Sequence, residues 1–380
     1  MQKILVTGGC GYIGSHTIVD LLNHGYEVIS IDDNSRSSSF SIAGIEQITG
    51  KKVKNYLVDL KNFEETQAVF QENTDIAGII HFAAYKAVGE SVNAPILYYE
   101  NNLFSLINLL KCVEEFSIPN FVFSSSCTVY GSPDAIPVTE LSPIKKAESP
   151  YGATKQMGEE ILQDFTKNGG CNSILLRYFN PVGAHPSAAI GELPIGRPQN
   201  LVPAITQTAI GKLPKMKVFG NDYDTRDGSC IRDYIHVCDI ARAHTLSIQY
   251  LAQEKNKTAC DIFNLGTGIG VTVLEAIQSF QEVSGVALNY EITARRPGDV
   301  VAIFANNDAA VLQLGWTIEY NLTDMMKTAW AWELKLKAQE DSAKTTNRST
   351  YWCNIFSAFS AICRASMKSS ISPPITASKL

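Results

Sequence analysis

The sequence contains no run of 18 or more apolar residues, so it offers no segment that would cross a membrane as a helix. The apolar run at the N-terminus is short and leads at once into glycines, which is unlike a secretory signal peptide. The nine cysteines are scattered and form no C-x-x-C pair. We therefore expect neither a bound metal nor a disulfide framework, and we expect the reducing environment of the cytoplasm.

Basic charge is also in short supply, because the net charge at pH 7 is −6. A nucleic-acid-binding domain would need a clustered basic face, so we expect no nucleic-acid partner. No internal repeat is visible. The 380 residues, 45% of them hydrophobic and 18% charged, are typical of a globular protein with about two domains.

Short apolar runs alternate with helical patterns over the first 180 residues. The runs are KILVTGG, YEVISIDD, IAGIIHFAA, PNFVFSSS and NSILLRYFN. Strands without polar alternation are buried on both faces, so this order predicts an α/β fold with a doubly wound, Rossmann-like parallel sheet. We assign residues 1–180 to this dinucleotide-binding domain, with a later segment at about 236–266 returning to it. Residues 181–337 are predicted to form mainly a second, smaller α/β substrate domain.

The last residues, 338–380, differ in composition from the rest. They are rich in Ser, Thr, Ala and Lys, which predicts a disordered tail. An apolar stretch at 351–363 lies inside this tail and is too short to span a bilayer. Its two readings are a loosely docked segment and a helix that binds an interface or a partner.

The stretch VTGGCGYIGSH places three glycines between a predicted strand and a predicted helix. Gly8, Gly11 and Gly14 would let the backbone turn tightly and approach a pyrophosphate, and the helix N-terminus would supply N–H donors. Asp32 follows at the end of the next strand. A carboxylate there accepts from both ribose hydroxyls of NAD and repels the extra phosphate of NADP, although Arg36 nearby keeps NADP open.

Further along the chain, several individual residues are candidates for the cofactor site, and two of them also have an ordinary structural explanation. Asp59 at a strand end is either a partner of the adenine amino group or the cap of a loop. Small residues after IIHF, including Ala83, would let a cofactor lie along the strand ends, and Lys86 is either a phosphate or ribose ligand or a surface lysine. His16 and His81 lie in apolar surroundings and are predicted to be buried core histidines.

The stretch SPYGATK carries a tyrosine and a lysine four residues apart. Pro150 suits the first turn of a helix, so Tyr151 and Lys155 would share one helical face near its start. A nearby positive charge favours a phenolate and lowers the pKa of a tyrosine. With Ser126 from FVFSSSCTVYG at a strand end, the three residues predict a site that deprotonates a hydroxyl during hydride transfer.

Taken together, these motifs resemble the extended short-chain dehydrogenase/reductase family and, within it, the UDP-glucose 4-epimerases (UDP-galactose 4-epimerases). TGGCGYIGSHT, HFAAYKAVGESV, FSSSCTVYG, SPYGATK, LRYFNPVGAHPS, GSCIRDYIHVCD, FNLGTG and RRPGD all stand in family order. The resemblance covers residues 2–335.

The resemblance implies a cofactor, a substrate and a set of residues for each. The NAD site would be lined by Gly8, Gly11, Tyr12, Ile13, Gly14, Asp32, Asn34, Asp59, Leu60, Phe82, Ala83, Lys86, Asn101, Ser126, Tyr151, Lys155 and Tyr178. A UDP-sugar would contact Lys86, Ser126, Tyr151, Asn180, Asn200, Leu201, Phe219, Arg232, Arg296 and Asp299. Two arginines suit a pyrophosphate.

The activity implied is inversion at carbon 4 of the sugar. Tyr151 takes the proton of the 4-hydroxyl while hydride passes to NAD, the 4-keto sugar rotates, and hydride returns to its other face. The family also implies a homodimer built on helix pairing, with the helices after Leu97 and after Pro150 as candidates.

Alternatives stay open at this point. Ile303 lies where family members carry either a bulky aromatic or a small residue beside the sugar's 2-substituent, so N-acetylated sugars are undecided. A UDP-pentose epimerase and a non-catalytic dinucleotide-sensing protein also remain. A nucleotide-sugar 4,6-dehydratase needs an acid and a base after Ser126, and Cys127 and Thr128 stand there instead.

Overall fold

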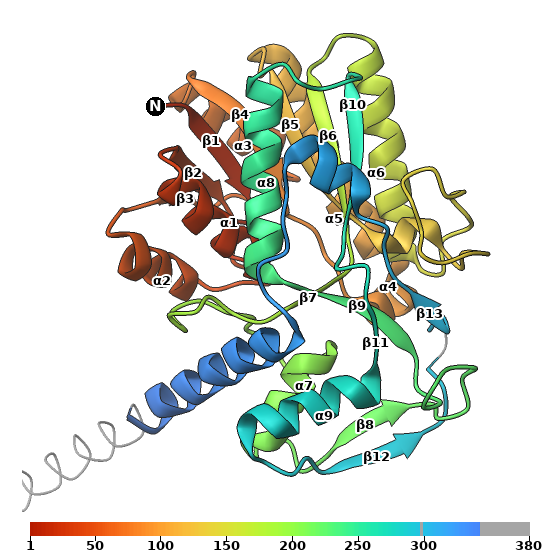
Figure 1. The fold of residues 1–380 in the computed structure, drawn as a ribbon. Coiled ribbons are helices and arrows are strands. Elements are labelled where there is room, and N and C mark those ends of the chain that lie inside the picture. The colour runs from red at the N-terminus through yellow and green to blue at the C-terminus, as the bar shows by residue number, and fades with distance from the viewer. Residues whose placement is uncertain (297–298, 343–380) are drawn as a thin grey trace, which may run out of the picture. The chain divides into compact units, whose positions relative to one another are not determined.

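The structure is a computed structural model that describes residues 1–296 and 299–342. Its centre is a sheet of seven parallel strands in the order β10-β6-β5-β4-β1-β2-β3 (Figure 1). The strands are β1 (Lys3–Thr7), β2 (Glu27–Ile31), β3 (Lys54–Tyr56), β4 (Ile76–His81), β5 (Asn120–Ser126), β6 (Asn172–Tyr178) and β10 (Cys260–Leu265). The predicted fold class is confirmed, and β10 adds a later segment of the chain to the edge beside β6.

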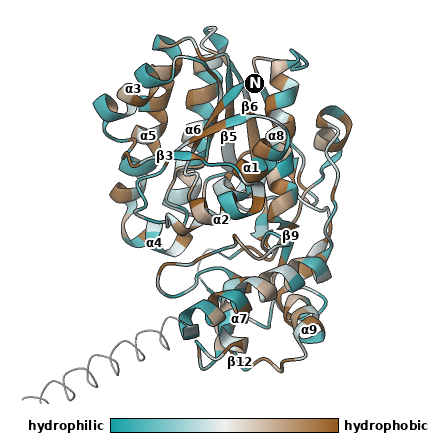
Figure 2. Ribbon diagram, turned by 90° about the vertical axis from the view of Figure 1, so that its left-hand side faces the viewer, coloured by the Kyte–Doolittle hydropathy of each residue, from teal (hydrophilic) through white to brown (hydrophobic). Residues whose placement is uncertain are grey.

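Helices cover both faces of this sheet. The helices are α1 (Tyr12–Asn23), α2 (Phe40–Thr49), α3 (Phe63–Glu72), α4 (Val88–Asn93), α5 (Pro95–Glu115), α6 (Pro150–Lys167) and α8 (Val237–Ala252). Helices α1, α2 and α8 enclose one hydrophobic cluster against the sheet, and α3, α5 and α6 enclose another on the opposite face. Figure 2 shows hydrophobic residues on the helices that flank the sheet. Two buried faces explain why the strands lack polar alternation.

The strand order reverses between β1 and β4. From β1 the chain adds β2 and β3 on one side, and it then returns to place β4 on the other side of β1. In open α/β sheets, the loops that leave the carboxyl ends of two such strands diverge to opposite faces of the sheet. In open α/β sheets this switch point is where ligands bind.

A second group of elements lies beyond the carboxyl ends of these strands (Figure 1). Strand β9 (Ile231–His236) pairs with β7 (Asn180–Val182), β11 (Gly270–Thr272) and β13 (Ala302–Ile303), while β8 (Met216–Phe219) pairs with β12 (Tyr290–Thr293). Helices α7 (Leu201–Ala209) and α9 (Val273–Ser284) share a hydrophobic cluster with β8. This region faces the same edge of the large sheet at which ligands are expected.

Residues 1–332 form one compact unit, and a second begins at 333. Of the predicted tail, residues 338–342 are helical, and the rest, including the apolar stretch at 351–363, lies outside the described residues. None of the helices within the described ranges has the length and apolar character that crossing a bilayer requires.

The predicted core histidines are confirmed, since His16 and His81 are each only 2% exposed. Burial lowers the pKa of both side chains to about 3, and it lowers the pKa of His244 in α8 to about 4. These imidazoles are therefore neutral in the folded protein, whereas in the unfolded chain they take up a proton near pH 6.5. The stability that they contribute is present above pH 6.5 and is lost as pH falls toward their folded pKa values.

We therefore predict that the variant His244→Asn loses less stability than the unmodified chain between pH 7.5 and pH 5. The difference should be about 2 kcal/mol, because at pH 5 the unfolded histidine is protonated and the folded one is not. Urea unfolding at both pH values measures it. An equal loss in the two proteins would show that His244 is not buried in its neutral form.

Candidate active site

The glycine turn after β1 brings three backbone segments into close approach. Gly8 has a φ of +70°, which favours glycine, and a Cβ there would lie 2.8 Å from the amide nitrogen of Ala83 after β4. A Cβ on Gly14 would lie 2.2 Å from the carbonyl oxygen of Gly8. Helix α1 can start so close to the strand only because Gly14 has no side chain.

Helix α1 begins with no side chain capping its N-terminus. Gly11 stands at the N-cap position, so the first-turn N–H groups after it are available to an outside acceptor. No acidic residue occupies the first turn. The turn is thus a cradle of backbone donors at the positive end of a helix, which fits the pyrophosphate of a dinucleotide.

Asp32 lies directly after β2, beside this turn. Its carboxylate accepts from the backbone N–H groups of Cys10 (2.9 Å) and Asn34 (2.9 Å) and from the hydroxyl of Ser37 (2.6 Å). Burial raises its pKa, and these hydrogen bonds act in the opposite direction. The position at the strand end suits a ribose diol.

Arg36, which left NADP open, is already engaged. Its guanidinium forms an ion pair with Glu90 at 2.8 Å and stacks over the ring of Tyr85 at 4.6 Å. Contact with an added phosphate would have to replace the pair with Glu90. This arrangement favours NAD over NADP.

Other residues predicted to line the cofactor also lie along the carboxyl ends of the strands. The hydroxyl of Tyr12 donates to the carbonyl of Gly183 at 2.5 Å, and Ile13 packs against the core cluster beneath α1. The ring of Phe82 contacts that of His244 at 4.5 Å, and the hydroxyl of Tyr178 is bonded to that of Ser124.

Asp59 has the contacts of a loop cap. Its carboxylate accepts from the N–H of Lys61 at 3.0 Å, and Leu60 between them is buried. The amide of Asn101 donates to Asn102 (3.1 Å), whose side chain in turn holds Tyr85. A role of Asp59 at the adenine stays a prediction.

Lys86 and Asn200 meet at a residue that the sequence did not single out. The carboxylate of Glu192 lies 3.3 Å from the ammonium of Lys86 and accepts from the Asn200 amide at 2.6 Å. Asn200 stands at the N-cap position of α7, where Leu201 begins the helix. Glu192 therefore joins a loop of the large sheet to the start of α7. No motif marks it, because only the folded chain brings its partners together.

The predicted catalytic residues converge at one point of the sheet edge. Ser149 caps α6 by accepting from the N–H of Gly152 at 3.1 Å, and Tyr151 and Lys155 follow on one face, 8% and 5% exposed. The ammonium of Lys155 lies 6.0 Å from the centre of the Tyr151 ring and donates to the carbonyl of Ser124 at 2.6 Å. Helix capping and the end of β5 thus set the pair in place.

Ser126 is the last residue of β5, and its hydrogen bond acts on Tyr151. It caps the short helix Cys127–Tyr130 by accepting from the N–H of Thr128 at 3.3 Å. Burial raises the pKa of Tyr151 far above its usual value, and the hydrogen bond with Ser126 only partly opposes this. Burial also lowers the pKa of Lys155 to about 8. The lowered pKa that the sequence predicted for Tyr151 is therefore not found for the chain alone, because burial has the largest effect on this phenol.

A second polar cluster assembles residues predicted to bind UDP. The carboxylate of Asp299 accepts from the guanidinium of Arg296 at 2.8 and 3.1 Å and lies 3.4 Å from that of Arg232 on β9. The Arg296 guanidinium also lies over the ring of Phe219, 5.4 Å from its centre. Asn180 begins β7, beside β9. Two guanidinium groups and an aromatic face are suited to a nucleoside diphosphate.

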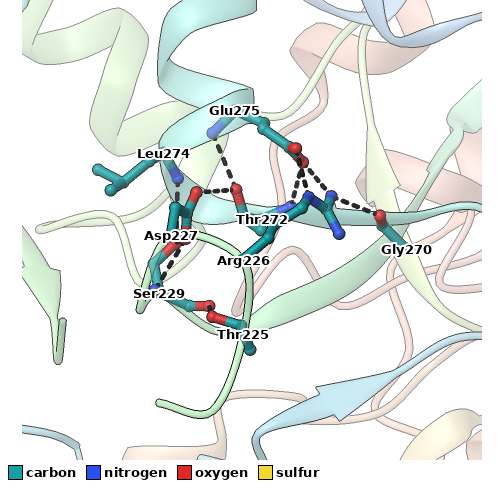
Figure 3. Close-up of polar contacts among 8 residues, drawn as sticks. All are labelled: Thr225, Arg226, Asp227, Ser229, Gly270, Thr272, Leu274 and Glu275. Carbon is teal, nitrogen blue, oxygen red and sulfur yellow. Dashed lines mark hydrogen bonds and ion pairs between the residues drawn. The ribbon is translucent and has the colours of Figure 1, made fainter. Parts of the chain in front are cut away.

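A hydrogen-bonded network holds the chain just before β9 (Figure 3). Arg226 pairs with Glu275 and donates to the carbonyl of Gly270 at 2.8 Å, and Thr272 donates to Asp227. Thr272 and Glu275 also form a capping box that starts α9. The network fixes where β9 begins and thereby where Arg232 stands.

Ile303 is buried rather than open to a cleft. It pairs in register with Arg232 and packs in a cluster with Tyr130 and Phe179, at 5% exposure. Its cluster includes Val129 and Tyr130 of the short helix after Ser126. Its effect on the 2-substituent of a sugar stays a prediction.

The fold and this constellation define a class of protein, the NAD-dependent short-chain dehydrogenases/reductases. The sequence matches the family described as GDP-mannose 4,6 dehydratase over residues 5–329. It is 48% identical to a UDP-glucose 4-epimerase of Bacillus subtilis over 87% of this chain and 97% of that one. It is 47% identical to one of Schizosaccharomyces pombe, over 87% and 94%. A solved UDP-glucose 4-epimerase of Bifidobacterium longum, in complex with NAD+ and UDP, is 44% identical, with a TM-score of 0.84 over 88% of this chain and 98% of that one. The chain belongs to the UDP-glucose 4-epimerase family and is an NAD-dependent enzyme.

We predict that Gly14→Ala abolishes the retention of NAD by the purified protein. The added methyl would clash with the Gly8 carbonyl. Helix α1 would then have to shift, and the backbone donors at its start would no longer form the cradle. The matched control is Gly89→Ala in α4, where a Cβ would meet nothing within 4 Å. Nucleotide released on denaturation and measured by absorbance gives the cofactor content. Equal NAD in both variants would contradict the close approach of α1 and β1.

Proposed function

We propose that the chain interconverts UDP-glucose and UDP-galactose, with Tyr151 as the group that accepts and returns the proton of the sugar 4-hydroxyl. The convergence of Tyr151, Lys155 and Ser126 at the sheet edge is the observation that carries this proposal. NAD, when bound, supplies the hydride acceptor and then the hydride donor at carbon 4. It would be held by the cradle at Gly11 and by Asp32.

Each of the three residues has a separate task in this proposal. The hydroxyl of Ser126 holds the sugar oxygen, because it already lies against Tyr151 at the end of β5. Lys155 stabilises the phenolate of Tyr151, which is the form that accepts the sugar proton. Their burial keeps water from the reacting oxygen, so the 4-keto sugar is protected while it turns.

The substrate would be anchored by its nucleotide and not by its sugar. Arg232 and Arg296 are the pyrophosphate ligands in this proposal, Phe219 lies against the uracil, and Asn180, Asn200 and Leu201 complete that wall. Binding energy from this remote part holds the intermediate while the reacting ring is free to rotate. We accordingly assign cofactor binding to residues 1–180 and 236–266 and UDP-sugar binding mainly to 181–337.

We predict that Tyr151→Phe lowers kcat for epimerisation by about 100-fold or more, the usual scale for removing a general base. The purified protein, without added cofactor, is incubated with UDP-galactose and separately with UDP-N-acetylgalactosamine, and chromatography resolves the products. UDP-glucose should form in the first tube with the unmodified chain. The second tube tests whether Ile303 admits an acetamido group. No turnover even after adding NAD would refute the proposed function.

We further propose that the enzyme is a homodimer formed through α5 and α6. Leu97, Phe104 and Ile107 are exposed along one face of α5, and Met157 is exposed on α6. Adjacent exposed apolar residues on two helices are typical of an interface. The scattered cysteines support a location in the cytoplasm, where thiols stay reduced.

Phe104→Glu should then convert the dimer to a monomer, because it places a charge in the apolar interface. Leu141→Glu is the matched control, since Leu141 is 94% exposed on a loop. Sedimentation velocity at micromolar concentration distinguishes the two states. A dimeric Phe104→Glu variant would refute this interface, and a monomeric unmodified chain would refute the dimer.

A further inference from the structure

The carboxylate of Glu159 lies behind the reacting groups of the site. It stands on α6 four residues after Lys155 and eight after Tyr151, so all three share one face of the helix. The residue is 4% exposed. Its oxygens accept from Nε (2.9 Å) and Nη2 (2.6 Å) of Arg177 and from the hydroxyl of Ser125. One side chain therefore links α6 to β6 and to β5.

The two partners of Glu159 are themselves neighbours in the sheet. Ser125 and Arg177 are paired in register at the ends of β5 and β6. The next pair in register is Ser126 and Tyr178, both predicted site residues. Successive side chains of a strand point to opposite faces of the sheet. When Glu159 binds Ser125 and Arg177 from α6, it therefore also fixes the backbone that carries Ser126 and Tyr178.

This buried ion pair is fully bonded. The remaining guanidinium nitrogen of Arg177 donates to the hydroxyl of Tyr130 at 3.1 Å and to the carbonyl of Glu140 at 3.4 Å. Tyr130 in turn donates to Asn264 at 2.6 Å. Well-packed apolar residues can replace a buried ion pair without loss of stability, so stability alone does not account for these charges.

We propose that Glu159 is a positioning residue, which aligns α6 with the ends of β5 and β6 so that Tyr151 and Ser126 meet the same sugar oxygen and Lys155 stays beside Tyr151. This inference deepens the proposed function and rests on it. In this role Glu159 does not touch substrate and acts through Lys155 and Ser126.

Glu159 also acts on Lys155 through its charge. Burial lowers the pKa of Lys155 to about 8, and the negative charge of Glu159 opposes this. Tyr151 faces Lys155 from the same helix, and its phenolate, the form that accepts the sugar proton, favours the charged lysine as well. His81 faces it from β4, where burial keeps the imidazole neutral by lowering its pKa to about 3. The carboxylate therefore favours the protonated lysine that stabilises a phenolate.

The test removes both charges together. Glu159→Gln alone would leave the guanidinium of Arg177 buried and unpaired, so the informative variant is Glu159→Gln with Arg177→Met. We expect kcat to fall by about tenfold or more while KM for UDP-galactose stays within about threefold. Without the carboxylate, Lys155 loses its proton at lower pH. The loss of kcat at alkaline pH should therefore begin about one unit lower.

Two further variants keep the result decisive. Asp261→Asn is the control for lost stability, because Asp261 is a buried carboxylate at the far end of the sheet that holds the turn before β10. It should lower the unfolding midpoint without changing kcat. Ser125→Ala removes one hydrogen bond to Glu159 and leaves the ion pair, so kcat should fall by about fivefold at constant KM.

Unchanged kcat and unchanged pH dependence in a folded double variant would overturn the inference. If the double variant does not fold, an unchanged kcat in Ser125→Ala would overturn it equally. The unmodified chain is measured in the same assay. Its failure to interconvert the sugars would instead refute the proposed function, so the two failures are distinguishable.

Discussion

The contact between the start of α1 and the end of β1 sets the geometry of the whole cofactor side. Gly14 lies so near the carbonyl of Gly8 that no other residue fits, and Gly8 in turn lies against the backbone of Ala83. These approaches hold α1 over the switch point between β1 and β4. The free N–H groups of the helix, the carboxylate of Asp32 and the small residues after β4 are therefore held close together.

In the other half of the site, around Tyr151 and Lys155, desolvation has the largest effect on the pKa values. Burial alone would keep Tyr151 protonated and would favour neutral Lys155, which is the reverse of what proton abstraction requires. The chain offsets part of this cost with fixed partners: Ser126 beside the phenol and the Ser124 carbonyl at the ammonium. A buried site with preset partners does not need to reorganise water as charge moves.

The sequence was sufficient to predict the fold class, because short apolar runs without polar alternation and the glycine turn reflect local rules of burial and backbone geometry. The sequence also predicted that Tyr151, Lys155 and Ser126 form one site at the end of a strand. It did not predict the pKa of Tyr151, since burial depends on packing between distant segments. Glu192 and Arg177 were missed for the same reason. Glu159 could have been found, because it continues the four-residue spacing of Tyr151 and Lys155.

The pairing of Asp299 with both arginines means that the proposed pyrophosphate site carries its own anion. An incoming diphosphate must share or displace a carboxylate that already occupies the two guanidinium groups. The affinity gained is the difference between two anions, so it is smaller than bare arginines would give. An internal competitor of this kind also lets a spent nucleotide leave, because the arginines are never left without a counter-ion.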